Sequence, residues 1–421
     1  MVNPANFINF NSFFLLMNVY EEFVDLSYEP SAKDLVCVFQ VSPCNRKSAG
    51  SIAAESSIGT WTELTTLSER MKEKLMARVF KIGKDTVSIA YHPELFEKNN
   101  MPQILSSVAG NVFGMKHLKK LRLIDLVFPR GIARSFKGPA FGIDGIRKIT
   151  KVKDRPLVGT IVKPKIGLSP AEHARVAYEA WVGGCDIVKD DENLSNQSFN
   201  SFQKRVELTL KAKRKAEKET GEVKIYMPNV TAETNEMLRR AREVKRRAGE
   251  YVMVDVLTSG FSAVQTLRDA CTGRVLHAHR AMHAAITRSN EFGVDMHVLA
   301  RIFRTIGVDQ LHVGTGVGKM AEDKKAVIKN IKALTDSYHG IKQVMPVASG
   351  GLHPGMVPDI IKLFGKNVVI QAGGGIHGHP KGTLAGAKAM RAAVDAVSEG
   401  HVLPYAAART PELKEALAKW Q

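Results

Sequence analysis

The feature that most constrains the fold is a regular alternation that begins after Pro156. Eight short runs rich in β-branched residues each precede a longer amphipathic stretch, which is typical of consecutive βα units. Eight such units predict an α/β protein with a closed (β/α)8 (TIM) barrel. A doubly wound open sheet is the alternative, but "KPKIGLS" after the first strand is not the glycine loop that a nucleotide-binding sheet carries. We expect the strands at residues 157–163, 185–189, 223–227, 251–257, 275–279, 310–313, 343–348 and 368–372.

Two helix signals support this division. Ser169, Pro170 and Glu172 form the pattern of a capping box with proline at the first helical position, so a helix is expected to begin there. Gly221 is placed to end the helix before the third strand.

The segment before the barrel mixes strands and helices without a repeat. "DLVCVFQVS" and "TVSIAYH" predict strands, and "WTELTTLSERMKEKLMARVF" contains a predicted helix. We therefore expect a smaller α+β domain at residues 18–140, followed by the barrel with its C-terminal tail at 141–421. Residues 1–17 are expected to be an N-terminal extension, and Met17 is an alternative start.

Composition limits the class of protein. The 421 residues carry 60 Lys and Arg against 42 Asp and Glu, a net charge of +18 that attracts anions such as phosphorylated metabolites. Nucleic-acid binding is the alternative from another class, but it calls for a clustered basic face with exposed aromatics, and only 7% of residues are aromatic. The four cysteines are far apart, which fits a cytoplasmic location. The apolar start is too interrupted for a membrane span, and no membrane association is expected.

Polar residues follow the predicted strands at the end where barrel enzymes place their active sites. Two glycine-rich strand ends near the chain's end offer free backbone N–H groups, the usual phosphate cradle, and Arg280 with His312 can hold a second anion. Two phosphate sites across one barrel mouth predict a bisphosphate substrate. The residues at these ends are Lys163, Lys165, Lys189, Asp191, Glu192, His279, Arg280, His312, Ser349, Gly350, Gly351, Gly373 and Gly374.

The stretch "GGCDIVKDDENLS" predicts a metal site. Asp191 and Glu192 offer oxygen ligands of the kind that Mg²⁺ prefers. Lys189 cannot bind a cation as an ammonium, but a crowded lysine can lose its proton because burial disfavours its charge. The neutral amine can then add carbon dioxide and become a carbamate, which supplies a third oxygen ligand.

Structural alternatives exist for each of these features. Lys189 can instead form an ordinary ion pair, the histidines of "HAHRAMH" can be core residues, and the glycines can serve turns alone. The polar groups nevertheless fall on six of the eight predicted strand ends, which favours a site.

Several longer motifs carry a resemblance to a known family. "AAESSIGTWT", "GNVFGMKHLKKLRLIDL", "GTIVKPKIGLS", "GGCDIVKDDE", "HAHRAMHA", "LHVGTGVGKM", "PVASGGLH" and "QAGGGIHGHP" occur in the family's order. The chain thus resembles the large subunit of ribulose-1,5-bisphosphate carboxylase/oxygenase (RuBisCO) from about Tyr20 to the barrel's end. The sequences of these motifs are most similar to those of the archaeal form III branch, which has no small subunit. The resemblance implies a ferredoxin-like fold for the N-terminal domain.

The resemblance implies roles for the site residues. Lys189, as a carbamate, would bind Mg²⁺ with Asp191 and Glu192 and take the C3 proton of ribulose 1,5-bisphosphate. Lys163, supported by Lys165, would assist enolisation, and His279 would transfer protons. Lys319 would close over the substrate on a mobile loop. One phosphate would be bound by Arg280, His312 and Ser349, and the other phosphate by Thr60, Trp61, Gly351, Gly373 and Gly374. Gly350 and Gln371 would also bind the substrate.

The resemblance also implies assembly and reaction. Glu55 and Asn111 would reach the barrel of a neighbouring subunit, so a homo-oligomer with its active site at a dimer interface is expected. The reaction would be carboxylation of an enediolate to two 3-phosphoglycerates, with oxygenation competing and with nucleoside (AMP) salvage as the context. A RuBisCO-like enolase acting on another sugar phosphate is the alternative. Ile58 stands where the family normally has Thr, which removes a hydroxyl beside Thr60, and the segment before Glu55 is shorter than usual.

Overall fold

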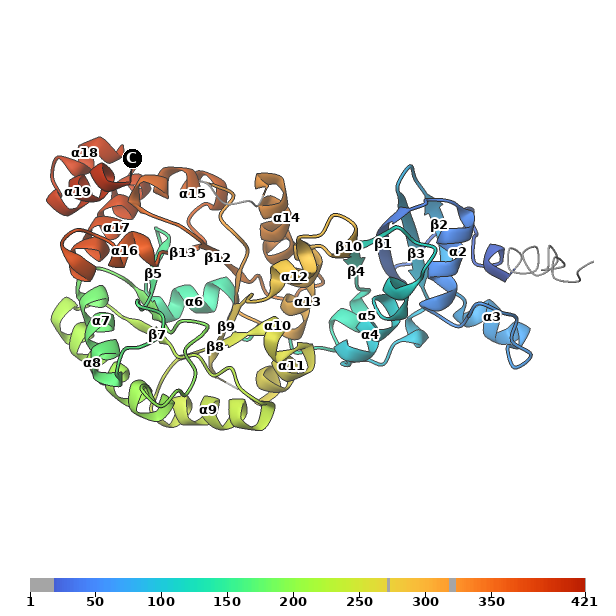
Figure 1. The fold of residues 1–421 in the computed structure, drawn as a ribbon, viewed down its shortest axis with the longest axis horizontal. Helices are drawn as coiled ribbons and strands as arrows, with labels where there is room; N and C mark the ends of the chain where they lie inside the picture. Colours follow the sequence, from blue (N-terminus) through green and yellow to red (C-terminus); the bar gives the residue numbers. More distant parts are fainter. Residues whose placement is uncertain (1–18, 271–272, 318–322, 421) are drawn as a thin grey trace, which may run out of the picture. The chain divides into compact units, whose positions relative to one another are not determined.

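A computed structural model describes residues 19–270, 273–317 and 323–420 of the chain. They divide into two compact units (Figure 1). The first unit runs to Phe136 and also takes in His283–Leu299, and the second contains Lys137–Met282 with the residues from Ala300 onward. Each unit has its own sheet.

The second unit is the predicted (β/α)8 barrel. Its eight strands are hydrogen-bonded in the order β7-β6-β5-β13-β12-β11-β9-β8, and all of the recorded pairs are parallel. A parallel bridge between Asn229 and Met253 joins β7 to β8 and closes the ring. The strands are β5 (Leu157–Ile161), β6 (Ile187–Lys189), β7 (Ile225–Met227), β8 (Tyr251–Asp255), β9 (Val275–His279), β11 (Gln310–His312), β12 (Met345–Ser349) and β13 (Val369–Gln371).

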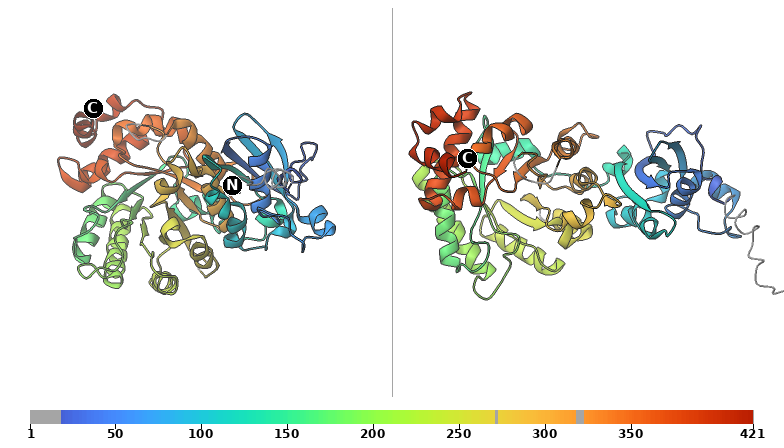
Figure 2. Two further views of the ribbon diagram at one scale, coloured as in Figure 1. Left: turned by 45° about the vertical axis from the view of Figure 1, so that its right-hand side comes forward. Right: turned by 45° about the horizontal axis from the view of Figure 1, so that its top comes forward.

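Helices surround this ring, and the views in Figure 2 show those coloured green outside the strands from both directions. The predicted capping box is present: Ser169 accepts from the backbone N–H of Glu172, whose side chain in turn accepts from the Ser169 N–H. Gly221 ends α8 in the left-handed conformation, as expected. The helices are α7 (Pro170–Val182), α8 (Phe202–Thr220), α9 (Thr234–Arg246), α10 (Val256–Ser259), α11 (Phe261–Ala270), α13 (Met296–Ile306), α14 (Lys324–Thr335), η3 (Pro354–Met356), α15 (Val357–Phe364), α16 (Gly374–His377), α17 (Gly382–Ser398), α18 (Leu403–Ala407) and α19 (Pro411–Lys419).

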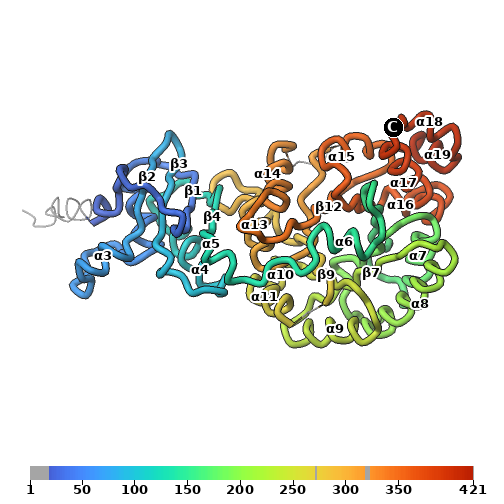
Figure 3. The backbone as a smooth tube through the Cα atoms, turned by 180° about the vertical axis from the view of Figure 1, so that it is seen from behind, coloured from blue at the N-terminus to red at the C-terminus, as the bar shows by residue number. Residues whose placement is uncertain are grey.

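Helix α6 (Gly142–Thr150) closes the N-terminal end of the barrel, and Figure 3 shows it passing near β7 and β9 when the chain is seen from behind. Its buried Ile143 and Ile146 share a core cluster with the first residues of seven strands, among them Leu157 and Tyr251. Apolar packing therefore fills one end of the barrel. The polar strand ends predicted to carry the chemistry lie at the other end.

The first unit has a five-stranded sheet in the order β10-β4-β1-β3-β2. Each of its last four strands is antiparallel to its neighbours among those four, and this order with its helical connections is the ferredoxin-like arrangement expected. The elements are β1 (Leu35–Ser42), α2 (Arg46–Glu55), α3 (Glu69–Leu75), β2 (Arg78–Ile82), β3 (Thr86–Tyr91), η1 (Pro93–Leu95), α4 (Met101–Val108), η2 (Asn111–Gly114), β4 (Lys120–Val127) and α5 (Arg130–Ala133).

The fifth strand of this sheet comes from far along the sequence. After α12 (His283–Thr287), the strand β10 (Phe292–Val294) pairs in parallel with β4. Buried Arg122 of β4 fastens the excursion: its guanidinium lies 2.5 Å from a carboxylate oxygen of Asp295 and donates to the carbonyl of Ser289. This excursion between the fifth and sixth barrel units is not predicted from the sequence.

In the described part of the chain, no helix has both the length and the apolar composition that a membrane span requires.

Candidate active site

Lys189 is the last residue of β6, and its side chain is fully buried at the open end of the barrel. Its Nζ atom donates to the carbonyl oxygen of Asp190 at 2.8 Å and lies 3.4 Å from Oε2 of Glu192. The third neighbour of Nζ is the sulfur of Met253 at 3.2 Å, which is only a weak acceptor. The amine thus points toward Glu192, one of the two predicted metal-binding acids.

Asp191 contacts a different lysine. Its Oδ2 atom lies 2.6 Å from Nζ of Lys163, on the loop that follows β5. The Asp191 carboxylate is buried, whereas the Lys163 side chain is one-third exposed. Two neighbouring strand ends are thereby joined by one ion pair.

Glu192 completes the cluster and bridges to His279 at the end of β9. Burial alone raises the pKa of Glu192, but the positive charges of Lys189 and His279 outweigh burial and lower this pKa to about 2. Its Oε2 atom lies 3.7 Å from Nε2 of His279. Glu192 is therefore an ionised carboxylate at neutral pH.

Asp190, between these residues in sequence, faces away from them. Its carboxylate accepts from Arg205 Nε at 3.0 Å, from the Tyr226 hydroxyl at 2.7 Å and from the Asn229 backbone N–H at 3.0 Å. Burial by itself raises the pKa of Asp190, but Arg205 overcomes it and holds the pKa far below its usual range. Side chains alternate along a strand, so Asp190 points to the opposite side from Lys189 and Asp191. Asp190 thereby anchors the turn that carries Asp191 and Glu192.

The donor set fits a magnesium ion only if Lys189 takes part. Asp191 and Glu192 supply two ionised carboxylates of the kind that Mg²⁺ prefers. Across the described residues, however, no three His, Cys, Asp or Glu side chains come together as a metal site. The remaining member of the cluster is Lys189, which would become an oxygen ligand if its amine were converted to a carbamate.

His279 is held from behind by Asp255, the last residue of β8. The Nδ1 atom of His279 lies 2.8 Å from Oδ1 of Asp255, and Thr231 donates from its hydroxyl to the other oxygen at 3.4 Å. A carboxylate at Nδ1 fixes the tautomer and leaves Nε2 facing the cluster. The sequence analysis missed Asp255 because it extended this strand to residue 257, which placed the acid inside the strand.

Two further histidines lie beside His279. His312, at the end of β11, packs edge-on against His279 with ring centroids 4.7 Å apart. Its Nδ1 atom lies 2.6 Å from the hydroxyl of Ser349, and its Nε2 atom lies 3.0 Å from Nε2 of His277. Ser349 ends β12, so three neighbouring strand ends meet here.

The glycine-rich ends of β12 and β13 leave their backbone open. Gly350 and Gly351 have φ angles of 112° and 66°, which residues other than glycine rarely adopt. A side chain at Gly373 would begin 3.2 Å from Cε of Lys163. Gln371 is buried, and its amide donates to the carbonyl of Thr160 at 3.0 Å.

The other predicted residues are placed as follows. Lys165 is exposed on the loop after β5. In the first unit, Glu55 ends α2, and Asn111 donates to its carboxylate at 3.3 Å, so these two predicted partners lie together. Trp61 is 69% exposed, and Thr60 beside it is half-buried. Lys319 lies outside the described residues.

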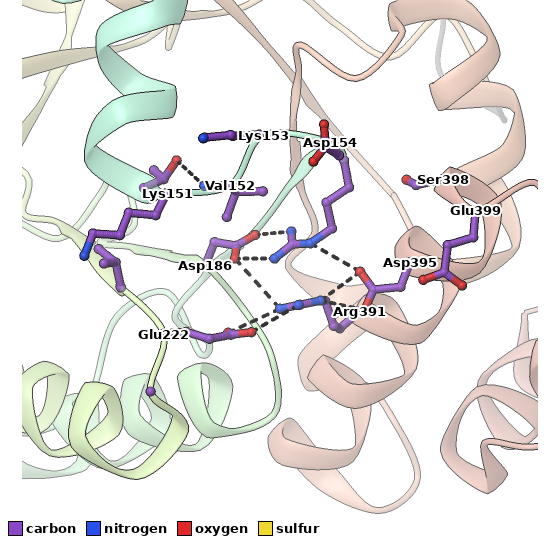
Figure 4. A pocket seen from close by; sticks show the side chains of 14 residues that line it. Lys151, Val152, Lys153, Asp154, Asp186, Glu222, Arg391, Asp395, Ser398 and Glu399 are labelled. Atoms are coloured by element: carbon purple, nitrogen blue, oxygen red, sulfur yellow. Dashed lines mark hydrogen bonds and ion pairs between the residues drawn. The ribbon is translucent and has the colours of Figure 1, made fainter.

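A cavity of about 560 Å³ lies at the opposite end of the barrel (Figure 4). Its walls carry Asp186, Arg155 and Arg391, and its charged groups are engaged with one another: the guanidinium of Arg155 meets both oxygens of Asp186, at 2.6 and 2.8 Å. Arg391 in turn donates to Glu222 at 3.1 Å. We infer that the residues of this cavity stabilise the barrel and do not take part in catalysis, because none of the predicted site residues lines it.

Comparison with known proteins decides the family. Residues 22–132 match the model of the ribulose bisphosphate carboxylase large chain, N-terminal domain, and residues 142–420 match that of the catalytic domain. This chain belongs to the RuBisCO large-chain family. The resemblance inferred from the motifs is thereby confirmed.

RuBisCO proteins of archaea are among its relatives. Ribulose bisphosphate carboxylase of Methanocaldococcus jannaschii is 50% identical over 95% of this chain and all of the relative. The crystal structure of octameric RuBisCO from Pyrococcus horikoshii with sulfate has a TM-score of 0.92 at 48% identity, over 95% of this chain and 96% of that one. Dimeric archaeal RuBisCO from Hyperthermus butylicus has a TM-score of 0.89 at 41% identity, over 96% and 99%.

Proposed function

We propose that this chain is a ribulose-1,5-bisphosphate carboxylase that joins carbon dioxide and water to its substrate and releases two 3-phosphoglycerates. The observation that supports this most is the meeting of Lys163, Lys189, Asp191, Glu192 and His279 at adjacent strand ends of one barrel. Relatives about half identical over nearly the whole chain carry the name of that enzyme.

The cofactor we propose is Mg²⁺, held by Asp191, Glu192 and Lys189 as its carbamate. When bound, the metal supplies a positive charge that stabilises negative charge developing on the substrate. Carbon dioxide adds to the neutral amine of a lysine, and the Nζ atom of Lys189 lies beside the carbonyl oxygen of Asp190 and the sulfur of Met253. We propose that carbon dioxide activates the enzyme by adding to this amine.

The residues around the metal ligands divide the proton transfers. Lys189 as a carbamate is proposed to accept the C3 proton, which leaves the electron pair on the substrate as an enediolate. Lys163 is proposed to donate to the enediolate oxygen and, later, to protonate the last carbanion, with Lys165 in support. His279, whose Nε2 faces the cluster because Asp255 holds Nδ1, is proposed to take the proton of the water that hydrates the carboxylated product.

Two groups of residues are proposed to bind the ends of the substrate. Arg280, His312 and Ser349 line one end, and the glycines after β12 and β13, with Gln371, Thr60 and Trp61, serve the other. Lys319 is proposed to close over the substrate. Competing oxygenation follows from the same enediolate, because a lining of this kind does not distinguish two small apolar gases.

The proposed assembly is a homo-oligomer without a small subunit. The relatives from Pyrococcus horikoshii and Hyperthermus butylicus are described as octameric and dimeric. Glu55 and Asn111, bonded to each other in the first unit, are proposed to serve the barrel of the partner subunit. Nucleoside salvage is the proposed context.

The deciding experiment supplies ribulose 1,5-bisphosphate, Mg²⁺ and labelled carbon dioxide to the purified protein. Labelled 3-phosphoglycerate should form, after a lag that disappears when the protein is first incubated with Mg²⁺ and carbon dioxide. Absence of product under these conditions would contradict the proposal. Turnover of only a methylthio-ketose phosphate would favour the related enolase instead.

A further inference from the structure

A chain of four side chains runs inward from the open end of the barrel. Ser349 contacts His312, His312 contacts His277, and the Nδ1 atom of His277 lies 2.9 Å from Oε1 of Gln310. Gln310 and His277 are fully buried, and His312 is 2% exposed. Neither Gln310 nor His277 belongs to the set of residues given a role above.

Each hydrogen bond in this row of four side chains has a definite donor and a definite acceptor. The amide nitrogen of Gln310 lies 4.0 Å from the sulfur of Met345, which can accept but has no hydrogen to donate. The amide oxygen therefore faces His277, and Nδ1 of that histidine must carry the hydrogen. Burial lowers the pKa of His277 to about 3 and that of His312 well below its usual range, so each ring is neutral and has a single N–H.

The donors of the two outer hydrogen bonds follow from the position of the hydrogen on His277. With its hydrogen on Nδ1, His277 has only a lone pair at Nε2, so Nε2 of His312 must donate to it. His312 is left with a lone pair at Nδ1, and the hydroxyl of Ser349 donates there at 2.6 Å. The hydroxyl hydrogen points into the barrel, and the lone pairs of Ser349 face outward.

We propose that Gln310 is a positioning residue, and that two buried histidines transmit its orientation to the hydroxyl of Ser349. Ser349 then accepts a hydrogen bond from a substrate hydroxyl, because an ionised phosphate oxygen has no hydrogen to give. Among the residues placed at this end of the substrate, Arg280 is left to attract the phosphate. The identity of the substrate rests on the proposed function, whereas the directed chain does not.

The positions of these hydrogens can be tested in the wild-type protein without an activity assay. Neutron diffraction from deuterated, substrate-free crystals should locate deuterium on Nδ1 of His277, on Nε2 of His312 and between Ser349 and His312. Deuterium on Nδ1 of His312, or on both nitrogens of either ring, would overturn the proposal.

Two nearly isosteric variants test the control exerted by Gln310. Gln310→Glu keeps an acceptor beside His277 and should leave the direction unchanged. Gln310→Met removes the acceptor, so the chain should reverse and the hydroxyl of Ser349 should point outward. Titration calorimetry with inorganic phosphate should then show about tenfold tighter binding by Gln310→Met than by wild type, because a hydroxyl now donates to the anion.

A merely structural defect would weaken phosphate binding, so the sign of the change separates the two explanations. The gain should vanish in the double variant Gln310→Met/Ser349→Ala. Equal or weaker binding by a folded Gln310→Met protein, or the same gain in Gln310→Glu, would refute the proposal. If Gln310→Met does not fold, the neutron experiment decides. Failure of the wild type to make 3-phosphoglycerate would overturn the proposed function and leave these readouts intact.

Discussion

The Nζ atom of Lys163 lies 2.6 Å from Oδ2 of Asp191, so a lysine proposed to act on the substrate also neutralises a proposed metal ligand. A cation that binds Asp191 must compete with this ammonium. Lys163→Met should therefore abolish carboxylation and at the same time tighten Mg²⁺ binding by about tenfold, the scale of one charge-assisted hydrogen bond.

Titration calorimetry with Mg²⁺ in bicarbonate buffer measures this effect. Lys165→Met, which changes an exposed lysine on the same loop, is the matched control and should leave Mg²⁺ affinity unchanged. Weaker Mg²⁺ binding by Lys163→Met would show that the ion pair does not compete with the metal.

Lys189→Met should lower carboxylation by at least about 10³-fold, because the base and a metal ligand are lost together. Lys224→Met is a matched control: Lys224 is also fully buried and lies 2.7 Å from a carboxylate oxygen of Glu222, but it precedes β7 at the far end of the barrel. This control should lose stability and keep its rate per folded molecule. Mass spectrometry after trapping of the carbamate should detect it on wild type and not on Lys189→Met. A carbamate retained in that variant would place the modification elsewhere.

Mixing two inactive variants should restore activity if each site uses two subunits. Glu55→Ala and Lys189→Met chains, unfolded and refolded together, would form mixed dimers in which one of the two sites is intact. About a quarter of the wild-type sites should then be recovered. Recovery absent from mixtures that gel filtration shows to be assembled would mean that Glu55 serves its own chain.

Stability should fall as the pH drops from 6.5 to 4. Burial, aided by the charge of Lys163, lowers the pKa of His377 from its ordinary 6.5 to about 4. Between these two pH values His377 is protonated in the unfolded chain but not in the folded chain, so acid favours unfolding. His377→Asn should reduce the slope of unfolding free energy against pH by up to about 1.4 kcal/mol per unit. Urea unfolding at several pH values measures it, and an unchanged slope would contradict the assignment.

Asp186→Asn should destabilise the barrel by about 3–5 kcal/mol, because it removes the buried carboxylate that meets Arg155 with both oxygens and leaves this guanidinium only the more exposed Asp395. The Asp186 carboxylate also accepts from the backbone N–H of Val158 at 2.8 Å, which joins β5 to β6. Asp154→Asn, at a 93% exposed carboxylate beside the same cavity, should change stability by less than about 0.5 kcal/mol. Chemical denaturation compares them, and equal effects would remove any special role for the buried pair.

Local rules explain why most of the barrel could be predicted. The strand positions follow from alternation of short apolar runs with amphipathic stretches, and the signals at Ser169 and Gly221 act within a few residues of themselves. Strand ends were less accurate: β5 stops at Ile161 rather than at residue 163, because the hydrogen-bonded ladder ends before the chain turns into the loop.

Features that depend on distant residues could not be predicted. Nothing near residue 292 indicates that its strand pairs with β4, because the pairing is set by Arg122 about 170 positions earlier. The separation of Asp190 from Asp191 depends on Arg205, which another helix supplies. The sequence indicates only that Gln310 begins a strand, since its contact with His277 forms between neighbouring strands.

The late arrival of β10 has a consequence for synthesis on the ribosome. When the first unit has emerged, β4 is still the edge of its sheet, with unpaired backbone groups that attract other strands. Roughly half of the barrel must be translated before Phe292–Val294 covers that edge. During this interval the uncovered edge of β4 is a place where copies on neighbouring ribosomes can pair with each other.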